Sequence, residues 1–128
     1  MIEPAFLLDT NILVYLIDGR SETLRRNIES HEPGHLATST LCVAEAALGL
    51  RGNERATIMF ERLLSIIKPL PFDLAAAHAF AEIPFRRGKL DRFIAAHAIA
   101  LGLPIVTNNE ADFADVPGLR VENWTLPA

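Results

Sequence analysis

Four acidic residues stand where a carboxylate is either costly or able to do chemistry. Asp9 interrupts the apolar run PAFLLDTNILVYLID. Glu45 lies in the small-residue stretch LCVAEAALGL, Asp91 opens DRFIAAHAIA, and Asp112 belongs to the polar segment TNNEADF. An isolated ionised carboxylate is expensive to bury, so Asp9 must cap a helix, pair with a base or bind a cation.

Three of these acids also have an ordinary structural explanation. Asp9 precedes a helical run, so a helix cap and a ligand are both open interpretations. Asp91 opens a helix, where capping alone is the simpler explanation for that residue. Asp112 lies in a polar segment, where a solvated carboxylate is the default.

Glu45 differs from the other three acids. Its neighbours three and four positions away on a helix are Leu41, Cys42, Leu48 and Gly49. This face is apolar and offers no lysine or arginine, which predicts a buried glutamate without a partner. Such a residue is a poor structural choice, so the pattern favours a functional role for Glu45.

The four acids taken together imply a cation. Two carboxylates 4 Å apart repel by about 4 kcal/mol at an effective dielectric constant near 20. Protons or a hard divalent cation must offset this repulsion. Oxygen ligands without histidine or cysteine point to Mg²⁺ or Mn²⁺.

Short apolar runs alternate with helical patterns along the chain. We expect strands at 5–8, 34–39, 68–72, 104–109 and 116–124, and helices at 10–17, 21–32, 40–50, 53–67, 73–83 and 91–102. Strands separated by helices predict an α/β fold with a central, mainly parallel sheet and helices on both faces. Asp9 ends the first strand, and residues 107–113 follow another, so both segments are directed to the carboxyl edge of the sheet, where function gathers.

Size and charge limit the classes of protein. The chain has 128 residues, 50% of them hydrophobic, and is expected to form a single domain, 1–128. A net charge of −4 argues against a simple electrostatic binder of nucleic acid, but not against an enzyme that meets phosphates through cations. The one cysteine, Cys42, and the absence of a secretory pattern favour the cytoplasm, and no apolar stretch is long enough for a membrane segment.

Three segments resemble a known family. LLDTNILVYL, TSTLCVAEAALGL and LDRFIAAHAIALGLPIVTNNEADFADVPGLRVENW are similar, in that order, to the PIN-domain ribonucleases, and most closely to the VapC toxins of bacterial toxin–antitoxin pairs. The resemblance covers nearly the whole chain. It implies a three-layer α/β/α PIN domain that cleaves RNA with Mg²⁺ or Mn²⁺, a cognate VapB-like antitoxin and a homodimer.

Carried over position by position, the resemblance also implies site residues. The four metal-binding and catalytic acids would be Asp9, Glu45, Asp91 and Asp112. Thr10 and Asn11 match the polar pair that steadies the first aspartate, and Thr107 is their counterpart after the late strand. Asn109 stands where some members have aspartate, so the resemblance leaves open whether Asp112 or Asn109 completes the site.

Four basic residues flank the third acid. Arg86, Arg87, Lys89 and Arg92 surround Asp91 and could contact RNA phosphates. A solvated basic loop is the alternative interpretation. The segment RRGKL that leads into Asp91 is shorter than in many relatives and lacks their polar residue before the aspartate, so the substrate-facing loop is expected to differ.

Other classes fit the sequence less well. A phospho-acceptor receiver domain is also acidic at its strand ends, but needs a lysine after a late strand, which PIVTNN does not supply. A phosphatase with an aspartate nucleophile would carry a second aspartate where Asn11 stands. A non-catalytic module with the same fold remains an alternative.

Overall fold

The computed structural model describes residues 2–84 and 90–127. These residues form a five-stranded sheet in the order β3-β2-β1-β4-β5, with every neighbouring pair parallel. The strands are β1 (Phe6–Leu8), β2 (Leu36–Ser39), β3 (Lys68–Leu70), β4 (Ile105–Val106) and β5 (Val121–Glu122). The predicted α/β fold with a parallel central sheet is confirmed.

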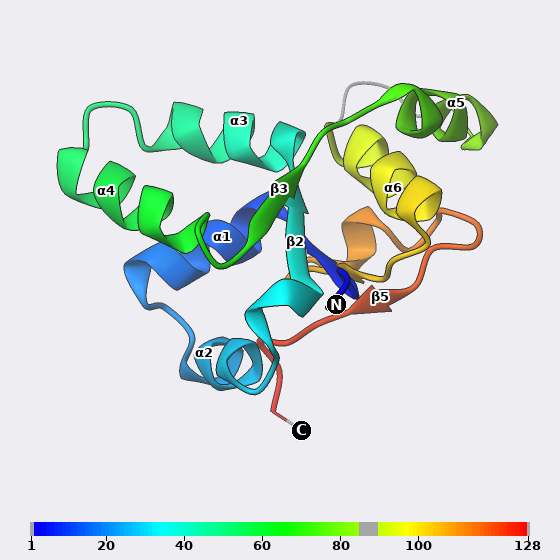
Figure 1. The fold of residues 1–128 in the computed structure, drawn as a ribbon. Helices are drawn as coiled ribbons and strands as arrows, with labels where there is room; N and C mark the ends of the chain where they lie inside the picture. Colours follow the sequence, from blue (N-terminus) through cyan, green and yellow to red (C-terminus); the bar gives the residue numbers. More distant parts are fainter. Residues whose placement is uncertain (1, 85–89, 128) are drawn as a thin grey trace.

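Helices cover both faces of the sheet. They are α1 (Thr10–Asp18), α2 (Glu22–Glu29), α3 (Thr40–Gly49), α4 (Glu54–Leu63), α5 (Leu74–Glu82) and α6 (Leu90–Leu101). Figure 1 shows α1, α3 and α4 on one side of the strands and α5 and α6 on the other, which gives the three layers. No helix in the described part of the chain is long and apolar enough to cross a membrane.

The last expected strand is shorter than its sequence suggested. Residues 116–124 were predicted as one strand, but only Val121 and Glu122 pair with β4. Pro117 and Gly118 precede them, and Gly118 has a φ of 80°, which places a turn where the strand was expected. The expected strand at 104–109 is likewise reduced to Ile105 and Val106.

The core forms where the sheet is covered on both faces. Leu7, Leu8, Ala37, Ile105 and Val106 are all fully buried. Consecutive buried residues, rather than alternating ones, are expected for a parallel strand between two helical layers. The core therefore holds the inner strands, and with them the positions where those strands end.

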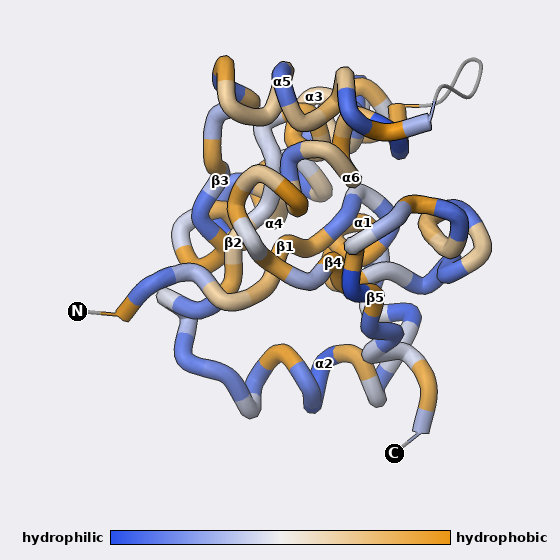
Figure 2. The backbone as a smooth tube through the Cα atoms, turned by 90° about the vertical axis from the view of Figure 1, so that its right-hand side faces the viewer, coloured by the Kyte–Doolittle hydropathy of each residue, from blue (hydrophilic) through white to orange (hydrophobic). Residues whose placement is uncertain are grey.

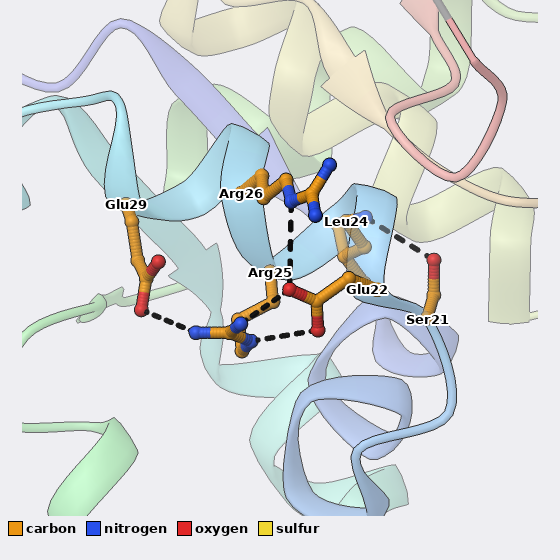
Figure 3. Close-up of polar contacts among 6 residues, drawn as sticks. All are labelled: Ser21, Glu22, Leu24, Arg25, Arg26 and Glu29. Carbon is orange, nitrogen blue, oxygen red and sulfur yellow. Dashed lines mark hydrogen bonds and ion pairs between the residues drawn. The ribbon is translucent and has the colours of Figure 1, made fainter.

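Helix α2 is amphipathic and lies outside these layers. Its trace in Figure 2 alternates between hydrophobic and hydrophilic residues. Figure 3 shows that Ser21 caps its first turn by accepting the Leu24 N–H (3.1 Å), while Arg25 bonds both Glu22 and Glu29. Exposed pairs of this kind contribute little to stability. They also balance the arginine charge on α2, so this helix offers no basic surface for nucleic acid.

Two helices begin immediately after inner strands. Asp9 follows β1 and caps α1, and Ser39 ends β2 and caps α3. The caps lie at the carboxyl edge of a parallel sheet, so the polar groups that start these helices converge on one region.

Candidate active site at the carboxyl edge of the sheet

Asp9 is the most deeply buried of the four predicted acids, with 5% of its surface exposed. Its backbone N–H donates to the Val106 carbonyl (3.0 Å), and its Oδ1 accepts the Ile12 N–H (3.1 Å). It is therefore a helix cap, as one interpretation of the sequence held. A cap does not require burial, however, so capping alone does not explain this environment.

The electrostatics of Asp9 show which acids surround it. Its pKa is raised from 3.8 to about 6, mainly by burial and with smaller contributions from the charges of Asp91 and Glu45. Hydrogen bonds from the Thr107 side chain and the Ile12 backbone act in the opposite direction. Asp9, Glu45 and Asp91 therefore share one neighbourhood, although they come from three distant parts of the chain.

The predicted burial of Glu45 is wrong. Glu45 lies on an exposed part of α3, where Leu48 is 63% exposed, while Cys42 on the same helix is fully buried. Apolar neighbours predicted burial, but two of them, Leu48 and Gly49, are themselves exposed in the structure. Glu45 instead accepts a short hydrogen bond from the Thr10 hydroxyl.

This bond gives Thr10 a different partner from the one expected. The resemblance implied that Thr10 and Asn11 steady Asp9, whereas the Thr10 hydroxyl orients Glu45. Asn11 is exposed in the first turn of α1. Thr107 has the expected partner, because its side chain hydrogen-bonds Asp9.

Asp91 lies in the first turn of α6 and is half-buried. Its charge reaches Asp9 from the helical layer opposite α1. Asp112 lies further along the chain, in the short 3-10 helix Glu110–Asp112. Its Oδ2 accepts from Asn109 Nδ2 (2.8 Å), so the two alternatives for the fourth position contact each other.

Asn109 also connects this segment to Asp9. Its backbone N–H donates to Thr107 Oγ1 (3.0 Å), and the Thr107 side chain hydrogen-bonds Asp9. Asp112 is thus coupled to the buried acid through two intermediate residues.

The predicted basic cluster is only partly described. Arg86, Arg87 and Lys89 lie outside the described residues. Arg92 is 6% exposed, and its Nη2 donates to Asp115 Oδ2 (2.8 Å). This guanidinium lies inside the protein, where it joins α6 to the loop after β4, rather than on the surface where RNA would meet it.

The carboxylate oxygens of Asp9, Glu45 and Asp91 are chemically suited to bind a hard divalent cation. The three acids offer carboxylate oxygens, and Mg²⁺ and Mn²⁺ prefer such ligands. Within residues 2–84 and 90–127, no group of three or more His, Cys, Asp or Glu side chains is already arranged to hold a metal ion. Glu45 is exposed and is oriented by the Thr10 hydroxyl, so its carboxylate is accessible to a cation from solvent.

Comparison with known proteins adds an independent observation. The model of the PIN domain family matches residues 6–119. The chain is 34% identical to a tRNA(fMet)-specific endonuclease VapC from Shigella flexneri, over 94% of this chain and 98% of the relative. It is 36% identical to Ribonuclease VapC2 of Haemophilus influenzae, over 93% and 97%.

Solved structures show the same similarity. DNA-bound VapBC from Salmonella typhimurium superimposes with a TM-score of 0.85 at 29% identity, covering 94% of this chain and 98% of the other. VapBC2 from Rickettsia felis, bound to a DNA fragment from its promoter, gives 0.84 at 28% identity with the same coverage.

Proposed function

The chain belongs to the PIN-domain family, as a VapC-type protein, and from that premise we propose that it is a divalent-cation-dependent endoribonuclease and the toxin of a VapBC-type pair. The observation that carries the proposal is Asp9, a buried carboxylate at the carboxyl edge whose pKa is raised by burial and by Asp91 and Glu45. Family membership leaves the receiver and phosphatase alternatives without support.

The proposed metal ligands are Asp9, Glu45 and Asp91, with Asp112 completing the site from the loop after β4. Mg²⁺ or Mn²⁺ would lower the pKa of a bound water and offset the charge that develops on the phosphodiester as it is hydrolysed. The residues of the chain prepare this site. Thr107 and the Ile12 N–H hold the Asp9 carboxylate, and Thr10 holds Glu45.

The proposed substrate is RNA, with tRNA or mRNA as the candidate classes. Two similar proteins are named as endonucleases specific for tRNA(fMet), which makes tRNA the first substrate to test. The net charge of −4 does not oppose this, because cations at the acids reduce the local repulsion of phosphates.

The test is cleavage of purified tRNA and mRNA by the protein with Mn²⁺ and with a chelator. We expect cleavage with Mn²⁺ and none with the chelator. Asp9→Asn should abolish cleavage. Asp73→Asn is the matched control, because Asp73 caps α5 by accepting the Ala76 N–H (3.0 Å), just as Asp9 caps α1.

Asparagine caps helices as well as aspartate does, so both variants should keep their helices. If Asp9 is only a cap, the two variants will cleave equally. An intact, folded parent without metal-dependent cleavage would instead support the non-catalytic alternative.

We also propose that an antitoxin helix binds between α1 and α4. A groove of about 260 Å³ lies there, lined by Leu16, Ile17, Met59, Arg62 and Leu63. Met59 is 40% exposed, and Ile58 beside it is 50% exposed. An apolar groove between helices suits the apolar face of a partner helix. The VapBC structures similar to this chain support a VapB-like antitoxin as that partner.

A further inference from the structure

His97 is a buried polar residue that the proposed site does not use. It lies on α6 with 1% of its surface exposed, and the Phe72 ring packs edge-on at 5.5 Å between centroids. Its neighbours Ala95, Ala96 and Ala98 on the helix are fully buried. A buried imidazole requires hydrogen-bond partners, and their identity shows what it connects.

One partner is Ser39. Its Oγ lies 2.9 Å from His97 Nδ1 and accepts the Leu41 N–H (3.1 Å). A serine hydroxyl has one proton and two lone pairs, so Ser39 can accept from Leu41 and also donate its own proton to His97. Proline has no backbone N–H, so the Pro71 carbonyl accepts a hydrogen bond from the ring, and a neutral imidazole that gives its one proton to Pro71 has its other nitrogen left to accept from Ser39. Burial lowers the pKa of His97, which keeps this neutral form at pH 7.

The position of Ser39 in the fold shows what this contact connects. It ends β2 and is the cap of α3, the helix that carries Glu45. His97 belongs to α6, the helix that carries Asp91 in its first turn. The Ser39–His97 hydrogen bond therefore joins the two helices that supply the second and third acids, and Pro71 adds the segment after β3.

We propose that His97 is a positioning residue, which through Ser39 fixes α6 against the start of α3 and so sets the separation of Asp91 from Glu45 and Asp9. The inference rests on the proposed metal-dependent function, because it assigns His97 to the assembly of that site. It goes beyond packing, since an apolar residue of similar size would fill the same space without making the bond.

A matched control exists elsewhere in the chain. His31 also makes a hydrogen bond through Nδ1, to the Asn27 carbonyl (2.7 Å), and stacks on Trp124 with centroids 4.5 Å apart. It follows α2 and joins that helix to the C-terminal segment. His31→Leu thus removes a bridging histidine without touching α3 or α6.

The experiment measures the Kd of Mn²⁺ by calorimetry, together with kcat and KM for RNA cleavage and the Tm without metal. We expect His97→Leu to weaken Mn²⁺ binding and lower kcat by about 10- to 100-fold, the usual effect of displacing groups that orient metal ligands, with KM little changed. His31→Leu should lower Tm and leave the Mn²⁺ Kd within about 2-fold of the parent, because it lies outside the site.

Two further variants keep the test decisive if His97→Leu does not fold. His97→Asn places an acceptor near the position of Nδ1, and His97→Gln reaches toward the position of Nε2. We expect Asn to retain tighter Mn²⁺ binding than Gln, because the Ser39 bond does the positioning. Equal binding by the two, or parent-like binding by folded His97→Leu, would overturn the inference. Absence of Mn²⁺ binding by the parent would instead overturn the proposed function.

Discussion

Asp9 combines two roles that are usually separate. As a cap it accepts the Ile12 N–H, and as a buried acid it lies beside the charges of Asp91 and Glu45. The capping bond favours the ionised form, while burial and the neighbouring acids oppose it more strongly, so the pKa is raised to about 6. A residue held in this way costs stability in the absence of a cation.

The pH dependence of unfolding follows from this shift. The folded protein holds the Asp9 proton more tightly than the unfolded chain, so stability should fall as pH rises from 3.8 to about 6 and stay reduced above it. Asp9→Asn keeps the cap and removes the charge. It should be more stable than the parent at pH 7, by up to about 3 kcal/mol, since one pKa unit is about 1.4 kcal/mol.

Urea unfolding with chelator present, measured from pH 3.5 to pH 8, checks this prediction. The difference between Asp9→Asn and the parent should shrink as pH falls through 6 and nearly vanish at the acid end. A difference that does not change with pH would mean that Asp9 does not titrate as its surroundings require.

The sequence singled out these acids as candidate site residues, but it did not predict correctly how buried each one is or which residue it bonds. Asp9 was expected to be buried, because it lies in a long apolar run, and it is. Glu45 was expected to be buried for a similar local reason, but burial of a helix face depends on which other element covers it, and spacing along one helix does not contain that information. The Thr10–Glu45 bond joins residues 35 positions apart, and was missed for the same reason.

The elements place the acids through a simple arrangement. Parallel strands end at the same edge, and α1 and α3 begin there without an intervening loop. Alternating strand and helix patterns were enough to predict this. The short strands were harder to bound, because β4 and β5 have two residues each and the apolar Val116 and Leu119, on either side of the Pro117–Gly118 turn, resemble strand residues.

The groove between α1 and α4 allows a prediction about the partner. Met59→Glu would place a charge among Leu16, Ile17 and Leu63, and desolvating it should weaken binding of the cognate antitoxin by about 2 kcal/mol, or roughly 30-fold. Leu74→Glu is the control, because Leu74 is 72% exposed on α5, away from the groove. Calorimetric titration of each variant with the antitoxin measures the effect, and equal affinities would exclude this groove.

At the scale of the molecule, an acidic protein has to approach RNA, its proposed substrate and a polyanion. The arginines of α2 are balanced by glutamates, and Arg92 is buried against Asp115. The arginines of α2 and Arg92 are therefore poor candidates to attract RNA, and we expect cations at the acids to reduce the repulsion of its phosphates. Cleavage should accordingly depend on divalent cations more strongly than on the total ionic strength.

The amount of exposed apolar surface leads to a second prediction at this scale. Leu48, Ile58, Ile66 and Leu126 are each at least 45% exposed. We expect the protein to form a homodimer that covers part of this surface. Light scattering at tens of micromolar should give twice the mass of one chain, and a monomer at that concentration would refute the expectation.

The central claim is that Asp9, Glu45 and Asp91 act as one metal-binding unit. The most direct measurement is the rate of RNA cleavage at saturating Mn²⁺ by Glu45→Gln, Asp91→Asn and the double variant, with the Tm of each measured without metal. We predict that each single change preserves or raises Tm, because it relieves repulsion, and lowers cleavage by about 100-fold or more. The double variant should lose little beyond either single one, since the acids act together. Full cleavage by a folded Asp91→Asn variant would contradict the account.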